Sequence, residues 1–375
     1  MIPISLYIHI PWCTKKCPFC DFNSYTIKTK IEEKKYIDLL IQDLKQELPL
    51  IKNRKIHSIF IGGGTPSLFT INNLKKLIKK IKTILLINYK IEITIESYPS
   101  EKEKKKILQY QKIGINRISL GIQTFNNKYI KKLNRNYLEK DIIQLLNTFK
   151  NKKKIYNFNI DIMHSLPDQS IQEAILDLKK AISFQPTHIS WYELTIEPNT
   201  PFYYKKLNIL SEKNKLKIIR QGNKILKKNG YIQYEISSYC KKKYQCKHNV
   251  NYWNFGDYIG IGCGAHGKIT DKINNSIIRT IKHKHIRDYI NDNFLQKKYV
   301  LDTKEIILEF FMNKLRLKRP LLKKDLYNFT GINKKFIQKN ISKCIQKGYL
   351  TEDNKYWKIT KKGELFLNSL LEIFC

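Results

Sequence analysis

Three cysteines lie close together near the N-terminus, Cys13, Cys17 and Cys20, in the segment CTKKCPFC. The spacing C-x3-C-x2-C curls a short loop so that three thiolates converge, and thiolates are the ligands of iron–sulfur clusters. A structural zinc site or a closed cluster uses four protein ligands, whereas a [4Fe-4S] cluster held by three thiolates leaves one iron open. The spacing therefore predicts an open cluster. A zinc site completed by a distant histidine, and three unbound thiols, are the alternatives.

A second candidate for ligand contact is the run GGGTP at 62–66. Glycine has no Cβ, so a ligand can approach the backbone of such a turn closely. A phosphate-binding loop would continue with Lys and then Ser or Thr, which the following residues lack. The run predicts a turn against a ligand other than a phosphate, with a simple tight turn as the alternative.

The elements that must position these residues alternate between short β-rich runs and longer amphipathic segments up to about residue 195. The strand-like runs are 4–10, 56–63, 91–97, 117–123, 158–164 and 188–195, and the helical segments between them are 31–50, 71–86, 100–112, 138–151 and 170–183. This alternation favours right-handed crossovers and a parallel sheet. Six such units are too few for a closed eight-stranded barrel, so we expect an α/β fold with a partial (β/α)6 TIM-type barrel.

Ligand chemistry in such a barrel lies at the C-terminal ends of the strands. The cysteines follow the first strand, the glycine run ends the second, Glu96 ends the third, Gln123 ends the fourth, and Asp161 lies in the fifth. We therefore expect all of these residues to meet in one site.

Two further regions follow the predicted core of 1–195. Residues 196–300 hold an amphipathic stretch at about 211–228 and then an aromatic and Gly-rich segment, and we interpret them as an extension of the barrel. Residues 301–375 read as three helices and a hairpin that turns at 352–354, a winged-helix-like α+β domain. No phosphate or base contacts can be identified there, which favours a lid or docking domain over DNA binding.

The net charge of +38 would ordinarily suggest a nucleic acid or an anionic membrane as partner. Lysine is, however, spread through nearly every segment together with Ile and Asn, so we interpret most charges as solvated faces and expect no nucleic-acid partner. Eight cysteines in 375 residues are too sparse for a disulfide scaffold and indicate a reducing compartment. With no signal peptide and no long apolar run, the sequence predicts a globular cytoplasmic protein.

The motifs, taken in order along the chain, resemble the radical S-adenosylmethionine (SAM) superfamily. Within it they are most similar to the oxygen-independent coproporphyrinogen III oxidases and their HemW-type relatives. The resemblance covers nearly the whole chain and rests on YIHIPWCTKKCPFCDFNS, GGGTPS, ESYP, RISLGIQTFN, LNR, NIDIMHSLP, YELTIEPNTPF, YEISSY, HNVNYW and GIGCGAHG.

The resemblance also implies which residues hold the cofactors. The turn formed by Gly63, Gly64 and Thr65 would hold the amino group of SAM. Other polar side chains would surround its ribose and carboxylate: Glu96, Gln123, Arg135 and Asp161. Tyr7 matches another SAM contact, and Phe19 would pack on the cluster.

Two functions of different class compete within this group. The oxidases carry a fourth cysteine two positions after the third, where this chain has Phe22, and that departure matches the HemW-type proteins. The segment HNVNYW at 248–253 is similar to a heme-associated motif of the same proteins, with His248 as the axial ligand and Tyr252 and Trp253 as flat apolar surface. The resemblance thus implies a heme chaperone that delivers heme to an acceptor hemoprotein, soluble or membrane-bound. A homodimer is compatible, and coproporphyrinogen III oxidation is the alternative function.

Some positions depart from the pattern of the group. Asn134, Ser165 and Asp168 stand where Gly is common, and Tyr137 stands where His is usual. The departure at Tyr137 is the one that bears on function. His266, in the Gly-rich turn GCGAHG, is a candidate for the adenine side of the site or for a structural role.

Overall fold

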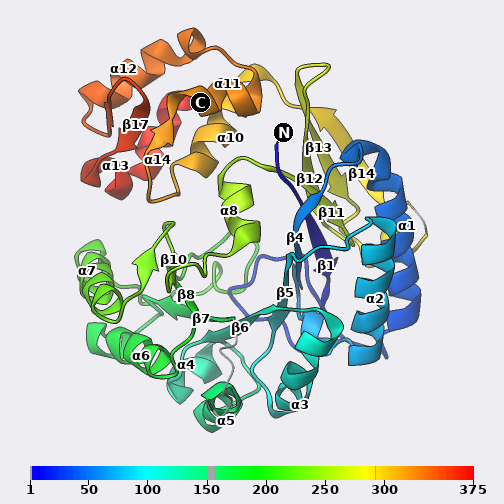
Figure 1. Cartoon of the computed structure of the whole chain (residues 1–375). Helices are drawn as coiled ribbons and strands as arrows, with labels where there is room; N and C mark the ends of the chain where they lie inside the picture. The colour runs from blue at the N-terminus through cyan, green and yellow to red at the C-terminus, as the bar shows by residue number, and fades with distance from the viewer. Residues whose placement is uncertain (1, 151–156, 292) are drawn as a thin grey trace.

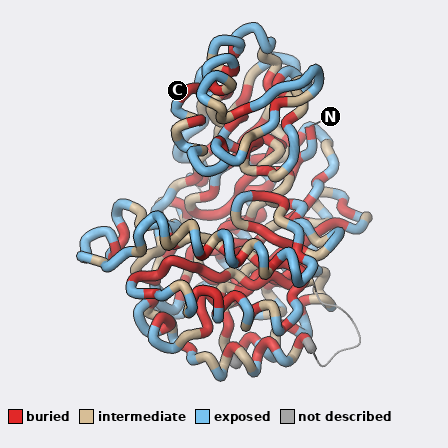
Figure 2. Tube along the Cα trace, turned by 90° about the vertical axis from the view of Figure 1, so that its left-hand side faces the viewer, coloured by how far each residue is buried: buried red, intermediate tan, exposed pale blue. Residues whose placement is uncertain are grey.

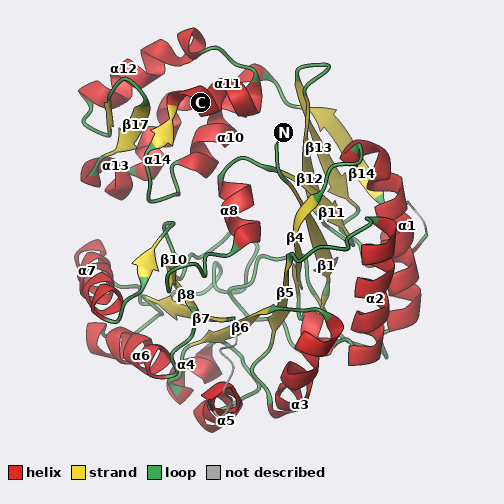
Figure 3. Cartoon of the chain, in the orientation of Figure 1, coloured by secondary structure: helices red, strands yellow, loops and turns green. Residues whose placement is uncertain are grey.

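One large sheet of twelve strands dominates the computed structural model of the chain, which describes residues 2–150, 157–291 and 293–375. The strand order is β14-β13-β12-β11-β1-β4-β5-β6-β7-β8-β10-β9. Neighbouring strands from β11 to β8 pair in parallel. The sheet curves around a central space, and helices cover its outer face (Figure 3). Its two end strands, β14 and β9, are not hydrogen-bonded to each other, so the barrel is open.

The expected barrel strands and helices are confirmed. The strands are β1 (Ile4–Ile10), β4 (Ile56–Gly63), β5 (Glu92–Ser97), β6 (Arg117–Gln123), β7 (Phe158–His164) and β8 (His188–Glu193). The helices are α1 (Glu33–Ile51), α2 (Ile71–Ile84), α3 (Glu101–Tyr110), α5 (Glu139–Lys150) and α6 (Ile171–Ser183), with a further short helix α4 (Asn127–Lys132) (Figure 1). Residue 151, the last of the expected 138–151 helix, lies outside the described residues.

These elements form because parallel strands with helices on one face and a packed interior on the other must bury most of their residues. In β1, Ile4, Leu6, Ile8 and Ile10 are all fully buried. Helix α6 begins with a capping box between Ser170 and Glu173 and buries a stripe of small and branched side chains on the sheet.

Residues 196–300 extend the sheet at both of its ends. On one side lie α7 (Glu212–Lys228), β9 (Ile232–Gln233) and β10 (Ser238–Cys240), with β10 antiparallel to β8. On the other side lie β11 (Asp257–Ile261), β12 (His266–Asp271), β13 (Ser276–Lys282), α9 (Ile286–Ile290) and β14 (Leu295–Val300). Helix α8 (Lys247–Trp253) connects the two sides. The parallel pairing of β11 with β1 was not predicted.

A smaller α+β domain follows, as expected. Its elements are α10 (Thr303–Lys314), β15 (Leu321–Leu322), α11 (Lys323–Thr330), α12 (Gln338–Gln346), β16 (Leu350–Glu352), β17 (Tyr356–Ile359), α13 (Lys361–Leu365) and α14 (Leu367–Leu371). Its three strands form a separate sheet, and the domain has a second cluster of buried residues of its own. Figure 2 shows the buried segments of this domain in red, near the C-terminus. Phe255 and Ile277, from the region 196–300, belong to that cluster, so the cluster crosses the expected boundary at 300. The boundaries at 195 and 300 stay predictions.

The C-terminal domain connects the two ends of the open sheet through ion pairs near α10. Glu309 of α10 accepts two hydrogen bonds, of 3.2 and 2.8 Å, from Arg279 of β13. Arg316, just after α10, lies 3.4 Å from Glu235, between β9 and β10.

No described helix is both long and apolar enough to cross a membrane.

Candidate functional site

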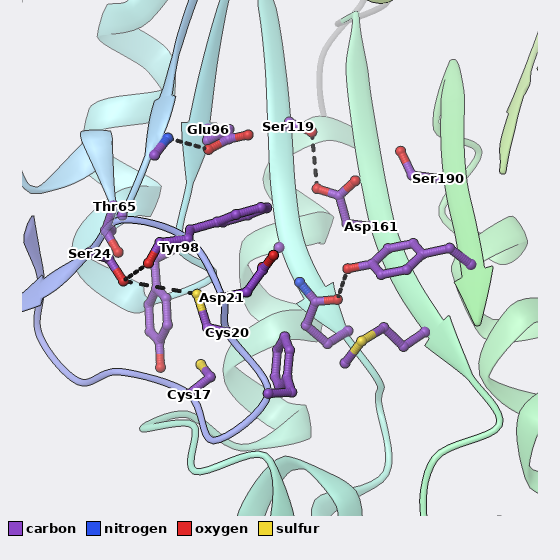
Figure 4. A pocket seen from close by; sticks show the side chains of 18 of the residues that line it. Cys17, Cys20, Asp21, Ser24, Thr65, Glu96, Tyr98, Ser119, Asp161 and Ser190 are labelled. Atoms are coloured by element: carbon purple, nitrogen blue, oxygen red, sulfur yellow. Dashed lines mark hydrogen bonds between the residues drawn. The ribbon is translucent and has the colours of Figure 1, made fainter. Parts of the chain in front are cut away.

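A cavity of about 450 Å³ lies inside the barrel and contains most of the predicted site residues. Eleven predicted residues line it: Cys13, Cys17, Phe19, Cys20, Gly63, Gly64, Thr65, Glu96, Gln123, Arg135 and Asp161. They come from the cysteine loop and from four successive parallel strands and their connections. The expectation that these residues meet at one site agrees with this arrangement (Figure 4).

The cysteine loop is held by a short parallel ribbon. β2 (Trp12–Cys13) pairs with β3 (Tyr25–Thr26), which brings the chain back beside its starting point. A turn in which the Cys20 amide donates to the Cys17 carbonyl then directs the side chains inward. Burial raises the pKa of the Cys13 and Cys17 thiols, and the charge of Arg135 acts in the opposite direction on both. A bound metal would supply the positive charge that favours the thiolate form of these groups.

The spacing of the three thiols limits which metal group they could hold. Among the described residues, no group of three or more His, Cys, Asp or Glu side chains is arranged to hold a metal ion. The three thiols nevertheless share one cavity wall. This arrangement disfavours the zinc alternative and suits a larger [4Fe-4S] cluster, whose irons hold thiolates farther apart than a single ion does.

The glycine turn contacts the cysteine segment directly. The Gly64 amide donates to the Ile10 carbonyl and the Thr65 amide to the Trp12 carbonyl. A Cβ added at Gly64 would lie 2.6 Å from the Trp12 carbonyl oxygen and 2.9 Å from Cys13 Sγ. The absence of a side chain at this position is therefore what allows the turn and the cysteine loop to pack together.

We expect Gly64→Ala to displace Cys13 and to lower the iron content of the reconstituted protein severalfold, because the clash involves the backbone. The measurement is iron per chain after anaerobic reconstitution, with the thermal midpoint as a second readout. Gly121→Ala is the matched control, since its Cβ would meet only the flexible Gln123 side chain, at 3.3 Å. Equal iron contents in the two variants would contradict the prediction.

Two carboxyl groups from neighbouring parts of the barrel face the same cavity. Glu96 accepts a hydrogen bond of 3.0 Å from the Gly63 amide, and burial together with the charge of Asp161 raises the pKa of Glu96 to about 8. Asp161 accepts from Ser119 and Asn159 at 3.0 and 2.7 Å, and burial raises its pKa too (Figure 4). Carboxyl groups held in this way can accept hydrogen bonds from the hydroxyl and ammonium groups of a ligand.

The raised pKa of Glu96 gives a testable pH dependence. A carboxyl group whose folded-state pKa lies above its ordinary value of 4.5 stabilises the fold below pH 4.5, and that stability is lost as the pH rises toward 8. We expect the free energy of unfolding to decline between pH 5 and pH 8 less steeply in Glu96→Gln than in the unchanged protein. Urea unfolding without SAM measures this, and parallel curves would refute it.

Arg135 lines the same cavity as the cysteine loop and the ends of the barrel strands. Its guanidinium lies 5.4 Å from the Tyr98 ring and 5.9 Å from the Phe19 ring, and its buried Nε has no hydrogen-bond partner. A buried guanidinium with an unused donor suits a ligand carboxylate, which it can bind through two parallel hydrogen bonds.

Tyr7 lies outside the cavity lining. Its hydroxyl lies 3.0 Å from His9 Nδ1, and His9 Nε2 lies 2.8 Å from the Asn23 carbonyl oxygen. A carbonyl only accepts, so Nε2 carries the proton and Tyr7 donates to Nδ1. The Tyr7 hydroxyl can then serve a ligand only as an acceptor.

His248 also lies outside the lining. It is on α8, which packs against β1, β4 and β11. Its Nδ1 lies 3.2 Å from Ser58 Oγ, and burial lowers its pKa to about 3. The imidazole is therefore neutral, the form that binds a metal. Its neighbours on α8, Asn249 and Trp253, do line the cavity.

The remaining departures have structural accounts. Asn134, Ser165 and Asp168, which replace common glycines, have φ angles of 58°, 59° and 62°, in the left-handed region that favours Gly. Tyr137 is buried and donates to the Ile122 carbonyl at 2.6 Å, so it supports β6 rather than lining the cavity. His266 is exposed at the start of β12 and does not line the cavity either.

Several cavity residues were missed by the sequence interpretation, chiefly Arg117 at the start of β6 and Glu235, Ser237 and Ser238 around β10. Arg117 stands in the run RISLGIQ, whose residues are otherwise apolar or small except at its end. A charged residue at the start of a strand that is buried on both faces is unusual, and this feature could have identified Arg117 as a site residue.

Comparison with known proteins agrees with this geometry. The model of the radical SAM superfamily matches residues 7–178, and that of the HemN C-terminal domain matches residues 301–366. The curated heme chaperone HemW of Buchnera aphidicola subsp. Schizaphis graminum is 54% identical, over 99% of this chain and 98% of that protein. The heme chaperone HemW of Escherichia coli K12 is 42% identical over the same shares.

Among solved structures, coproporphyrinogen III oxidase (HemN) from Escherichia coli aligns with a TM-score of 0.83. It covers 100% of this chain and 90% of its own, at 23% identity, which establishes a shared fold. The resemblance drawn from the motifs is confirmed, and with it the cofactors of the superfamily, a [4Fe-4S] cluster and SAM. The chain belongs to the HemW family of radical SAM proteins.

Proposed function

We propose that this protein is a heme chaperone, which binds heme and delivers it to an acceptor hemoprotein in the cytoplasm, soluble or membrane-bound. The observation that carries the proposal is the continuity of one cavity from the three cysteines to α8, the helix with His248, Tyr252 and Trp253. Full-length relatives named heme chaperone HemW support it.

Different residues along this cavity would bind the cluster and the separate groups of SAM. Cys13, Cys17 and Cys20 would hold the cluster, which when bound supplies an iron open to SAM. Gly63, Gly64 and Thr65 would hold the SAM amino group, and Arg135 its carboxylate. Glu96, Gln123 and Asp161 would hold the remaining polar groups, Phe19 would pack on the cluster, and Tyr7 would contribute its hydroxyl as an acceptor.

His248 would supply the axial ligand to heme iron. Its Nδ1 lies against Ser58, and no hydrogen bond of its Nε2 is found in the part of the chain that the structure describes. Glu92 accepts from the backbone amides of Lys247 and His248, both at 3.2 Å, and so fixes the start of α8. The hydrogen bond with Ser58 thereby orients the imidazole through Nδ1, and Nε2 would be the nitrogen that binds iron.

The test is anaerobic reconstitution with iron and sulfide, followed by a hemin titration and a coproporphyrinogen assay on the same sample. Stoichiometric heme uptake without decarboxylation supports the proposal. Robust formation of protoporphyrinogen would overturn it and establish the alternative function, coproporphyrinogen oxidation.

We expect His248→Ala to weaken hemin binding at least tenfold and to change the Soret band, because the axial nitrogen is lost. A hemin titration followed by absorbance measures both effects. His285→Ala, an exposed histidine before α9, is the control. An unchanged spectrum and affinity in His248→Ala would remove this residue from the heme site.

A further inference from the structure

The cavity continues well beyond the residues assigned to SAM. Arg117 and Gln123, which begin and end β6, both line it. A seven-residue strand spans about 20 Å, so the cavity runs along the barrel axis rather than remaining at its C-terminal rim. We call its far part the inner cavity, lined by Arg117, Asn159, Glu235, Ser238, Asn249 and Trp253.

Arg117 is the unusual residue of the inner cavity. It is only 2% exposed, and its Nε has no hydrogen-bond partner. That absence holds across residues 2–150, 157–291 and 293–375, although Cys246, Glu92 and Asp161 lie near enough to favour the charge of the guanidinium. A buried charged donor without a hydrogen-bond partner is costly, and a ligand that accepts from it removes that cost.

The carboxyl groups near Arg117 already have other partners. Glu92 accepts from the backbone amides at the start of α8. Asp161 accepts from Ser119 and Asn159. Glu235 accepts from Ser237 and lies beside Arg316. Among the described residues, the Nε of Arg117 is therefore a charged donor of the inner cavity that no protein group uses.

The surrounding groups favour a flat anionic ligand. The indole Nε1 of Trp253 is buried and has no partner among the described residues, so it offers a further donor. The Arg316 guanidinium lies 4.3 Å from the centre of the Trp253 ring. A guanidinium binds a carboxylate through two parallel hydrogen bonds. The chemistry of the site thus matches a carboxylate attached to an apolar or aromatic body.

We propose that Arg117 binds a carboxylate group in the inner cavity, and that this group is a propionate of heme. The assignment to heme rests on the proposed function, because α8 carries both the candidate heme ligand His248 and the cavity residues Asn249 and Trp253. A propionate is a short flexible chain, so it can enter a cavity of about 450 Å³ while the macrocycle stays outside. The carboxylate of SAM is the other source of the same chemistry.

The first test needs no variant. Hemin and hemin dimethyl ester, whose propionates are blocked, are titrated into the reconstituted protein. We expect the ester to bind about tenfold more weakly, as for a lost hydrogen-bonded charge. Equal affinities would overturn the assignment to heme. If hemin itself does not bind, the proposed function fails, and SAM affinity then decides whether Arg117 holds a carboxylate.

The second test compares Arg117→Met, Arg117→Lys and the exposed control Arg220→Met for hemin and SAM affinity. We expect hemin binding to weaken about tenfold in Arg117→Met, less in Arg117→Lys, and not in the control, with SAM affinity unchanged. Loss of SAM affinity alone would place the SAM carboxylate there and overturn the assignment to heme. If neither affinity changes, Arg117 is not a carboxylate site. Arg117→Lys keeps the charge and serves if Arg117→Met does not fold.

Discussion

Replacing Cys13, Cys17 and Cys20 together by Ala is expected to abolish the iron–sulfur cluster completely. The three thiols are the cysteines that line the cavity, and a cluster with no protein thiolate has nothing to anchor it. Iron and sulfide content and the broad visible absorbance measure the loss. Single substitutions should each remove most of the cluster, because two thiolates hold a cubane poorly.

Cys375→Ala is the control for this experiment, since Cys375 is exposed at the C-terminus and distant in sequence from the loop. It should retain full iron content. A triple variant that still carries iron and sulfide in stoichiometric amounts would show that other groups hold the cluster, and the assignment of the cysteine loop would be wrong.

Arg135→Gln is expected to weaken SAM binding about 100-fold while leaving the cluster in place. The guanidinium is enclosed by Tyr98 and Phe19 and has an unused Nε donor, so a ligand carboxylate gains a charged, largely dehydrated partner. Losing one partner of such a pair costs about 3 kcal/mol, which corresponds to about 100-fold in affinity. Equilibrium binding of SAM to the reconstituted protein measures the effect.

The interpretation of that result depends on the iron content, because Arg135 also lowers the pKa of Cys17. Iron per chain equal to that of the unchanged protein would separate a direct role in SAM binding from a loss of the cluster. Arg220→Gln, on the exposed face of α7, is the matched control. SAM affinity within twofold of the control would refute the role of Arg135.

The local pattern of the sequence was sufficient to predict the barrel strands and the part of the site that lies at their C-terminal ends. The runs at 4–10, 56–63, 117–123 and 158–164 match β1, β4, β6 and β7 residue for residue, because buried parallel strands are continuous apolar segments bounded by turns. Residues at the ends of such strands must converge, which is why the cysteines, Glu96 and Gln123 could be grouped in advance.

What the sequence could not provide depends on contacts between distant segments. β11 pairs with β1 although about 250 residues separate them, and nothing in the short run at 257–261 specifies that partner. The positions of Tyr7 and His248 outside the cavity lining follow from hydrogen bonds to His9 and Ser58, which spacing alone does not reveal. Arg117 belongs to the site because the cavity extends to the start of β6, and the sequence does not reveal that depth.

The open sheet has a mechanical consequence. A barrel closed by a continuous ladder can widen only by breaking backbone hydrogen bonds, and these do not depend on salt. Here the two ends of the sheet are joined through the C-terminal domain, partly by a backbone bridge between Glu235 and Leu317 and partly by two ion pairs, Arg279 with Glu309 and Arg316 with Glu235. Dissolved ions screen such pairs. The ion-pair part of this connection therefore weakens as ionic strength rises, whereas the backbone bridge between Glu235 and Leu317 does not.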